Sequence, residues 1–328
     1  MKKILALVLV AAMACVALSV AALGEGEWPT TRTVELVTPL AAGGGTDIYA
    51  RLLAEQLTKA TGSNFVVNNQ TAGGGALAYN QIANGPKDGS QLLVCTTSLF
   101  TSYLSGTHQV HPLDAFKTFN ITCSLTPHYI VVPANSEWNT IDEFVAYAKA
   151  NPGKIVFGMQ IGSASHFVAQ SAMNSLGIEV RFVEAGSDGA RMTAVLGNVV
   201  QASLINGTTT TQYAASGDIK ALACVYTIDP ETAPEALKSV PSLADAGYQD
   251  VDVVINIMFL APKSVDDAVI ETMHKLFYEA EVSEVMLEKD KEMNQPKEFF
   301  DSLESTLEWN EKTFKAYQEA AAGMGLSK

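Results

Sequence analysis

The chain has 328 residues, of which 48% are hydrophobic and 17% are charged. That apolar content supports a packed core and excludes a mainly disordered chain, and the length favours two domains. The formal net charge is −14 and the body of the chain has no cluster of Lys and Arg, which argues against nucleic acid or an anionic membrane surface as the main partner.

The first residues have the pattern of an export signal. Lys2 and Lys3 form a positively charged start, an apolar run follows, and Gly24 ends a small-residue cleavage site, so we predict a signal peptide over residues 1–24. Residues 4–23 are also long enough to stay as a membrane anchor, and lipidation at Cys15 is a third option. The chain is therefore predicted to be exported, to the periplasm or to the cell surface.

Short strands then alternate with amphipathic helices. In the first part of the chain, strands are predicted over residues 34–38, 65–67 and 91–95. Helices begin at Thr46 and near Leu77, each directly after a run of glycines. Such strand–glycine loop–helix units are typical of α/β proteins.

The same alternation continues to the C-terminus. Further strands are predicted over residues 129–132, 154–157, 180–183, 199–204, 219–225 and 251–260. Helices are predicted from Thr140, where Glu143 completes a capping box, from the loop at 162–166, from Asp266 to Glu279, and over residues 296–321. This order predicts an α/β fold with parallel or mixed sheets that are covered by helices on both sides.

Three cysteines lie beyond the export signal, Cys95, Cys123 and Cys224. Their number is odd and their spacing matches no zinc or redox motif, so we expect buried thiols within strands. One disulfide between Cys123 and Cys224 is left open, because an exported protein meets an oxidising compartment.

Three loops rich in glycine or serine follow strands and open helices, at residues 43–47, 73–76 and 162–166. Glycine lets the backbone approach a ligand closely, and a helix N-terminus presents unpaired N–H groups with a partial positive charge. Ligands of open α/β sheets bind at the carboxyl ends of strands, where such loops lie. The pattern predicts an anion site that needs neither Lys nor Arg.

Two side chains of these loops have two interpretations each. Asp47 lies in the first turn of its helix, where it would cap N–H groups and organise the loop, or hydrogen-bond a ligand or water. His166 is either a ligand contact or a packed helix residue.

Motifs of catalysis are weak or missing from the sequence. There is no P-loop, zinc-protease or nucleophile-elbow motif, and the glycines from Gly73 match a dinucleotide fingerprint only loosely. Ser163 and Ser165 precede His166, but no carboxylate that would orient the histidine is evident. We predict no enzyme, no catalytic residue, no cofactor and no metal, and keep a secreted serine hydrolase as the alternative of another class.

Taken in order, these motifs resemble the solute-binding receptors of tripartite tricarboxylate transporters, a bacterial family also called Bug receptors. The resemblance covers nearly the whole chain after the export signal. It is carried by residues 38–52, 68–75, 86–93, 150–154, 162–166, 221–223, 240–248 and 261–262. Each motif is weak alone, and the ordered set is specific.

The resemblance implies a two-lobed periplasmic-binding-protein fold of type II, the Venus-flytrap architecture. Lobe one would comprise residues 26–125 plus 227–328, and lobe two residues 126–226. The function implied is capture of a small organic anion, a carboxylate, and its delivery to the permease subunits in the membrane, by a protein that we expect to be a monomer.

The resemblance also implies a set of ligand-binding residues in each lobe. In lobe one they are Leu40, Gly44, Gly45, Thr46, Asp47, Gly74, Gly75, Ala76, Thr97 and Ser98. In lobe two they are Gly162, Ser163, Ser165, His166, Glu184, Gly186, Ser187 and Asn206.

The sequence departs from the family pattern in lobe two. Glu184 and Ala185 replace an aromatic residue and a lysine, and Gln201 replaces an aspartate. If Glu184 faces the cleft, it disfavours a second carboxylate on the ligand and favours an amino or hydroxyl group. A receptor for an amino acid or another zwitterionic or neutral solute is kept as an alternative, and so, independently of Glu184, is a sensor-linked receptor without a permease.

Overall fold

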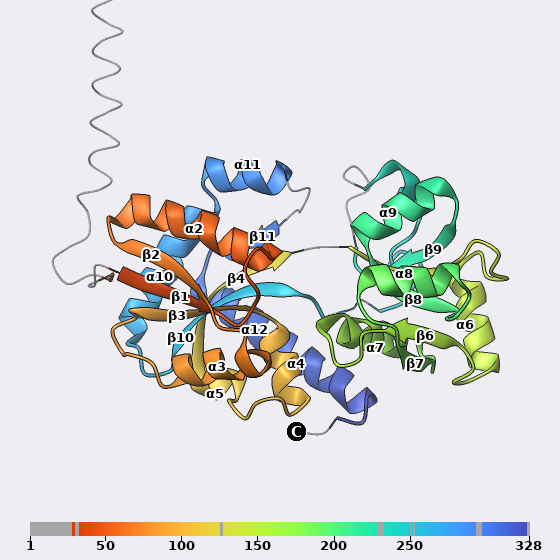
Figure 1. Cartoon of the computed structure of the whole chain (residues 1–328), viewed down its shortest axis with the longest axis horizontal. Coiled ribbons are helices and arrows are strands. Elements are labelled where there is room, and N and C mark those ends of the chain that lie inside the picture. The colour runs from red at the N-terminus through yellow and green to blue at the C-terminus, as the bar shows by residue number, and fades with distance from the viewer. Residues whose placement is uncertain are drawn as a thin grey trace, which may run out of the picture.

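The computed structural model describes residues 28–29, 33–124, 127–227, 233–249, 251, 253–292 and 297–326. The predicted signal peptide and Cys15 lie outside these described residues. The described chain folds into two lobes, one at each side of Figure 1, and each lobe has a sheet of its own.

Lobe one is built on a six-stranded mixed sheet. In spatial order its strands are β11 (Lys297–Phe299), β4 (Phe116–Ser124), β10 (Asn256–Pro262), β3 (Gln91–Thr96), β1 (Thr33–Thr38) and β2 (Asn64–Asn69). β1 pairs in parallel with β2 and β3, whereas β10 lies antiparallel to β3 and β4. The sheet therefore joins an N-terminal and a C-terminal part of the chain.

Helices pack on both faces of this sheet. Successive strand residues point to opposite faces, so Leu36 packs in one apolar cluster with α2 and α10, and Val37 packs in another with α3, α4 and α12. The helices of lobe one are α2 (Gly45–Thr61), η1 (Ala72–Gly75), α3 (Ala76–Ala83), α4 (Ser98–Leu104), α5 (Pro112–Ala115), α10 (Asp267–Glu281), α11 (Glu284–Glu292) and α12 (Leu303–Gly323).

Lobe two has a five-stranded sheet. Its spatial order is β7 (Arg181–Glu184), β6 (Val156–Met159), β8 (Ala202–Asn206), β5 (His128–Pro133) and β9 (Ile219–Cys224). β6 pairs in parallel with β7 and β8, and β5 lies antiparallel to β8 and β9. Its helices are α6 (Ile141–Ala150), α7 (Ala164–Leu176), α8 (Asp188–Leu196) and α9 (Gly207–Ser216), and η2 (Glu235–Leu237), from the segment that returns to lobe one, packs against α9.

The predicted capping box at the start of α6 is confirmed. Thr140 is the N-cap, and its Oγ1 accepts a hydrogen bond of 3.2 Å from the amide of Glu143. The Glu143 carboxylate reaches back to the amide of Asn139 at 2.6 Å. Two N–H groups that the helix itself cannot satisfy are thus paired.

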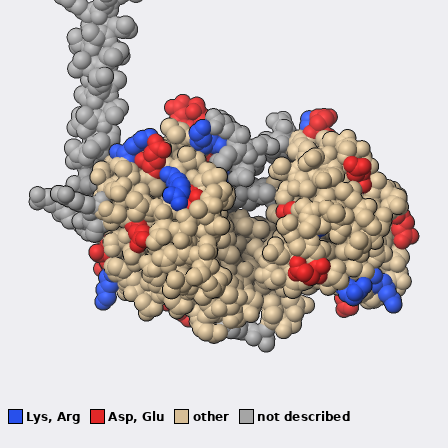
Figure 2. Space-filling view, viewed as in Figure 1, with Lys and Arg blue, Asp and Glu red and all other residues tan. Residues whose placement is uncertain are grey.

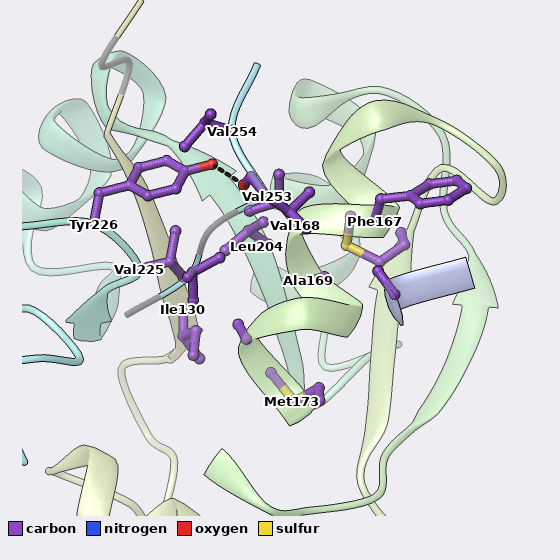
Figure 3. Packing of buried hydrophobic residues seen from close by; sticks show 14 of the residues in the cluster. Ile130, Phe167, Val168, Ala169, Met173, Leu204, Val225, Tyr226, Val253 and Val254 are labelled. Carbon is purple, nitrogen blue, oxygen red and sulfur yellow. Dashed lines mark hydrogen bonds between the residues drawn. The ribbon is translucent and has the colours of Figure 1, made fainter. Parts of the chain in front are cut away.

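The two lobes share apolar packing around α12. The rings of Phe167 in α7 and Tyr317 in α12 lie 5.6 Å apart, and Tyr317 also contacts Phe100 of α4. One hydrophobic cluster therefore contains residues of both lobes. Figure 3 shows Phe167 and Tyr226 among the apolar side chains of this cluster.

The prediction of one long strand over residues 251–260 is wrong in its first half, because β10 begins only at Asn256. Residues 253–255 lead into lobe one, and two of their carbonyl groups bond to side chains instead of a neighbouring strand. Tyr226 donates to Val253 at 3.1 Å, and Tyr317 donates to Val254 at 2.9 Å. The segment is apolar because it is buried between the lobes.

The prediction of a helix over residues 296–321 is wrong at its start. Residues Lys297–Phe299 form β11, which pairs antiparallel with β4 at the edge of the sheet, and α12 begins at Leu303 behind the N-cap Ser302. Edge pairing and the burial of Lys297 override the helical pattern there.

Two further points concern the pairing of the described cysteines and the length of the described helices. Cys95 and Cys224 are buried free thiols, so Cys224 forms no disulfide in this structure. Among the described residues, no helix combines the length and the apolar character that crossing a bilayer requires.

Candidate functional site

A cavity of about 510 Å³ lies between the two lobes. Figure 2 shows the recess between the lobes, with few charged atoms at its border on this face. Lobe one contributes Gly45, Thr46, Tyr49, Thr96, Ile255, Asn256, Ile257 and Lys297. Lobe two contributes His128, Asp188, Asn206, Thr208, Thr209 and Tyr226. A cavity with both lobes as walls is the usual place for a small ligand in such a fold.

The N-terminus of α2 opens on the lobe-one wall of this cavity. Its N-cap is Gly44, and no side chain of the described residues caps the helix. Gly45 and Thr46, the first helical residues, both line the cavity, and within the described chain their amides have no hydrogen-bond acceptor. These N–H groups and the helix dipole create a positive potential at the wall without a charged side chain.

Asp47 holds the loop that leads into α2. Its carboxylate accepts from the amide of Gly43 at 2.9 Å, from Nδ2 of Asn69 at 2.9 Å, and from Arg51 at 3.0 Å. Asn69 also donates to the carbonyl of Leu40, which fixes the loop to β2. The Arg51 guanidinium and these donors lower the pKa of Asp47 to about 2. Asp47 therefore organises the loop, which is the first of the two interpretations that the sequence allowed for this residue.

A cluster of buried ionisable groups includes Lys297 and Tyr49 of the lobe-one wall and extends behind it. Lys297 forms an ion pair with Asp290, its ammonium lies 3.8 Å from the ring centre of Tyr49, and its side chain is only 2% exposed. Burial lowers the pKa of Lys297. Tyr49 donates to Glu281 at 3.0 Å, and burial raises the pKa of Glu281 to about 7.

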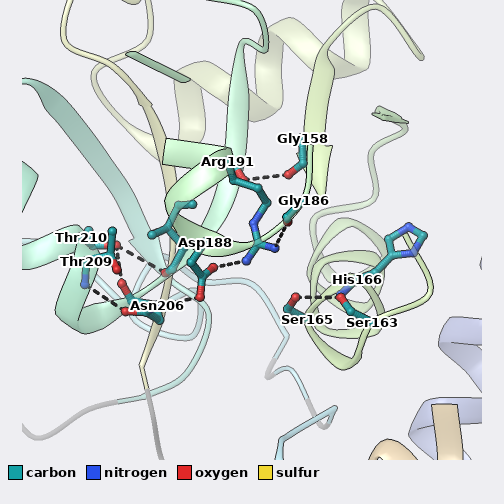
Figure 4. Close-up of polar contacts among 12 residues, drawn as sticks. Gly158, Ser163, Ser165, His166, Gly186, Asp188, Arg191, Asn206, Thr209 and Thr210 are labelled. Atoms are coloured by element: carbon teal, nitrogen blue, oxygen red, sulfur yellow. Dashed lines mark hydrogen bonds and ion pairs between the residues drawn. The ribbon is translucent and has the colours of Figure 1, made fainter. Parts of the chain in front are cut away.

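The polar centre of the lobe-two wall is Asp188 at the start of α8. Figure 4 shows its carboxylate between Arg191 and Asn206: it forms an ion pair with the guanidinium of Arg191 and accepts from Nδ2 of Asn206 at 2.6 Å. Arg191 is buried and also donates to the carbonyl of Gly186 at 2.9 Å. Burial lowers the pKa of Arg191, and the contact with Asp188 opposes this. Asp188 is thereby fixed in one orientation.

Asn206 connects this carboxylate to the next helix. It is the N-cap of α9, and its Oδ1 accepts from the amide of Thr209 at 2.9 Å. Thr208 and Thr209 then place hydroxyl-bearing side chains in the cavity wall. The wall thus combines one carboxylate with neutral groups that donate or accept hydrogen bonds.

Asn256 is an unsatisfied polar group in the cavity wall. It is only 1% exposed, and its Oδ1 has no hydrogen-bond partner among the described residues. A buried amide oxygen without a partner costs on the order of 1–3 kcal/mol, which a donor in the cavity would recover.

The structure brings three of the expected ligand-binding residues, Gly45, Thr46 and Asn206, to this cavity. The others lie outside its lining. Thr97 is buried and bonds to Tyr317 and Val254, and Ser98 bonds to Thr96. The residues of lobe one that are not in the lining are Leu40, Gly44, Asp47, Gly74, Gly75, Ala76, Thr97 and Ser98.

The loops before α7 and α8 are tied to each other by Glu184. One of its carboxylate oxygens accepts from the amide of Ile161 at 2.9 Å, and the other accepts from the amide of Gly186 at 2.8 Å. These two backbone N–H groups lower the pKa of Glu184. Gly162, Ser163, Ser165, His166, Glu184, Gly186 and Ser187 are not among the lining residues.

The histidine of this region does not form a nucleophile–base pair with its neighbouring serines. Nδ1 of His166 accepts from the amide of Gly162 at 3.1 Å, and Nε2 has no partner among the described residues. Ser163 and Ser165 bond to each other at 3.0 Å, and Figure 4 shows the ring turned away from both. Burial lowers the pKa of His166 to about 4, so the ring is neutral at physiological pH. His166 therefore packs as a helix residue.

Sequence reasoning missed most of the side chains in the cavity wall, above all Asp188 and Lys297. Asp188 directly follows Ser187, which was expected, and a carboxylate in the first turn of a helix was a usable signal. No sequence signal pointed to Lys297, because its position depends on β11, which the sequence pattern predicted as helix.

In the parts of the chain that the structure describes, no group of three or more His, Cys, Asp and Glu residues could hold a metal ion.

Comparison with known proteins shows the family of the chain. A family model described as "Tripartite tricarboxylate transporter family receptor" matches residues 49–293. Protein BugT of Bordetella pertussis is 26% identical over 263 residues, which cover 78% of this chain and 78% of BugT.

Solved structures show the same fold. A TctC solute binding protein from Polaromonas has a TM-score of 0.74 at 21% identity, over 91% of this chain and 99% of that chain. R. palustris Rpa4515, solved with adipate, has a TM-score of 0.66 at 20% identity, over 92% of this chain and 99% of that chain. The predicted two-lobed α/β fold is thereby confirmed.

Proposed function

Because the chain belongs to the tripartite tricarboxylate transporter receptor family, we propose that it captures a small organic carboxylate between its lobes and delivers it to the membrane subunits of a tripartite transporter. The resemblance drawn from the sequence motifs is confirmed by that family match. The family consists of periplasmic solute-binding receptors and not of enzymes. Rpa4515, a protein of this fold, was solved with the carboxylate adipate, which supports a carboxylate ligand here.

The observation that carries the proposal is the uncapped N-terminus of α2 in the cavity wall. A carboxylate placed there accepts from the amides of Gly45 and Thr46 and gains from the helix dipole. Hydrogen bonds to a charged group contribute about 1.5–3 kcal/mol each, more than those between neutral groups. Lys297 adds a positive charge on the same wall, partly offset by Asp290.

Binding across the cavity would couple the ligand to lobe closure. A ligand that touches both walls binds the closed form better than the open form, and so shifts the population towards closure. We place lobe one at residues 26–125 plus 227–328 and lobe two at 126–226. The support is that the strands of the two sheets fall on either side of residues 125–127 and of the segment before β10.

Backbone capture can be tested at Thr46 with a matched pair of variants. Thr46→Pro removes the amide hydrogen as well as the hydroxyl, whereas Thr46→Ala removes the hydroxyl alone. Proline is tolerated in the first turn of a helix, so the fold should survive. Titration calorimetry against 4-aminobutyrate, adipate and malate should show at least about tenfold weaker binding for Thr46→Pro than for Thr46→Ala.

Two results would count against carboxylate capture. One is equal affinity of the two variants, which would remove the α2 amides from the binding site. The other is the absence of heat and of thermal stabilisation with every carboxylate tested on the unaltered protein. Circular dichroism of both variants controls for loss of structure.

A further inference from the structure

The two walls of the cavity differ in the charged group that they offer a ligand. On lobe one, the N-terminus of α2 presents N–H donors and positive potential, while the charge of Lys297 is paired with Asp290. On lobe two, Asp188 is the only carboxylate among the described lining residues. A ligand that spans the cavity therefore meets hydrogen-bond donors at one end and a carboxylate at the other.

Asp188 has acceptor capacity left for a ligand. Two carboxylate oxygens offer about four acceptor positions, and the protein uses one on each oxygen, for Arg191 and for Asn206. The side chain of Asp188 is 30% exposed. Since both protein contacts hold it in place, its remaining lone pairs are fixed in the cavity wall and need no reordering when a donor arrives.

The ligand meets this carboxylate and not the guanidinium behind it. Arg191 has a side chain that is only 3% exposed, and it is not among the lining residues. A second carboxylate on the ligand would face the oxygens of Asp188 with no proton between them, which is repulsive. A hydroxyl or ammonium group would instead donate to Asp188.

We infer that the ligand is a carboxylate that also carries a hydrogen-bond donor, an ammonium or hydroxyl group, which Asp188 recognises on the lobe-two wall. This inference rests on the proposed function, because it takes the carboxylate end to lie at α2. It assigns to Asp188 the selection against a second carboxylate that the sequence had connected with Glu184, whose two oxygens accept from backbone amides.

A matched set of butyrates that differ only in the group on the fourth carbon tests it by titration calorimetry at neutral pH. Butyrate carries at its fourth carbon an ammonium group (4-aminobutyrate), a hydroxyl group (4-hydroxybutyrate), a carboxylate (glutarate) or a methyl group (pentanoate). A second set, succinate, malate and aspartate, varies the donor next to a carboxylate. We expect at least about tenfold tighter binding of a donor-bearing acid than of glutarate or succinate.

The variant Asp188→Asn should reduce that preference about tenfold or more, since its amide offers a donor where the carboxylate offered an acceptor. Asp218→Asn is the control, because it removes the same charge at an exposed position in lobe two outside the cavity lining. If Asp188→Asn fails to fold, the comparison of acids on the unaltered protein still decides.

The outcomes distinguish the inference about Asp188 from the proposed capture of a carboxylate. Glutarate or succinate binding as tightly as every donor-bearing acid overturns the inference and leaves carboxylate capture standing. An unchanged preference in Asp188→Asn also overturns it. Failure of every acid to bind overturns the proposed function itself. Preference for 4-aminobutyrate or for 4-hydroxybutyrate tells whether the donor is ammonium or hydroxyl.

Discussion

Glu281 is a fully buried carboxyl group one hydrogen bond away from the cavity. It accepts from Tyr49, which lines the cavity, and from Asn120 and Thr122 of β4. Burial raises its pKa from the ordinary 4.5 to about 7, although these three hydrogen bonds oppose the shift. The folded protein therefore keeps a proton on Glu281 at pH values where the unfolded chain has lost it.

Because of Glu281, the free energy of unfolding should therefore fall as the pH rises. The contribution is fully present below about pH 4.5 and is lost as pH rises to about 7, a change on the order of 3 kcal/mol. Glu281→Gln cannot titrate, so the difference in free energy of unfolding between the unaltered protein and the variant should change by that order over this range. Urea denaturation at a series of pH values measures it.

Taking the difference in free energy of unfolding between the unaltered protein and Glu281→Gln also removes the effect of His166. Burial lowers the pKa of that ring to about 4, so its contribution declines as pH falls from 6.5, opposite in direction to that of Glu281. Both proteins contain His166, and it cancels. Parallel pH profiles of the two proteins would show that Glu281 is ionised in the fold at neutral pH.

At the level of single residues, the sequence located the loop of Asp47 but not the partners of its carboxylate. Gly43 and Arg51 are near in sequence, whereas Asn69 comes from the neighbouring strand β2. For Glu184 the local pattern was misleading, since its backbone partners could be seen only in the folded loops. Residues whose partners are distant in sequence are those that patterning cannot assign.

Among the elements, the turn η1 fits against the end of β1 because of Gly75. This residue has φ of +91°, and a Cβ atom there would lie 2.6 Å from Cβ of Pro39. Gly62, at the end of α2, also has positive φ, at +75°, but a Cβ atom there would have no other atom within 4 Å. Alanine substitutions at the two glycines therefore distinguish the cost of backbone strain, which both share, from the cost of a steric clash, which only Gly75 has.

Gly75→Ala should therefore lower the free energy of unfolding by about 1–3 kcal/mol more than Gly62→Ala. Both variants place alanine in the left-handed region, which costs roughly 1–2 kcal/mol, and only Gly75→Ala adds the contact with Pro39. Urea denaturation of the two variants measures the difference. Equal losses would mean that η1 moves freely away from β1.

Helix starts were the elements best predicted from sequence, because capping and glycine signals are local. The start of α2 and the capping box of α6 are examples. The failures at residues 251–255 and at β11 have another cause, since the tertiary environment decides whether an apolar run joins a strand ladder. At 253–254 the hydroxyls of Tyr226 and Tyr317 take the carbonyls that a strand would have paired.

For the whole molecule, Tyr317 connects the lobes. Its hydroxyl donates to the carbonyl of Val254 at 2.9 Å and lies 2.8 Å from Oγ1 of Thr97, while its ring packs against Phe167 of lobe two. Tyr317→Phe keeps the ring and removes the hydroxyl, so we expect a loss of about 1–2 kcal/mol in the free energy of unfolding.

The control is Tyr147→Phe, at a half-buried tyrosine of α6 for whose hydroxyl the described residues give no hydrogen bond. It should change stability by less than about 0.5 kcal/mol. Denaturation of the two variants side by side provides the comparison. A loss at Tyr317 no larger than at Tyr147 would mean that the hydroxyl does not fasten the segment before β10.

The fold of the whole molecule could be predicted because its motifs follow one another in a specific order, and the family match confirms that reading. The set of residues that line the cavity could not be predicted from the sequence. Its walls combine residues as distant as Thr46 and Asn206, with Asn256 added from the strand that returns to lobe one. Which side chains meet there depends on how the two lobes are joined, and no local pattern encodes that.

Carboxylate capture by α2 is tested most directly by a crystal structure of the protein grown with saturating adipate and, separately, with 4-aminobutyrate. With at least one of the two acids, we expect a carboxylate oxygen about 3 Å from the amide nitrogens of Gly45 and Thr46, between closed lobes. A carboxylate bound only outside this cavity, or a cavity that stays without either acid at saturating concentration, would contradict the proposed function.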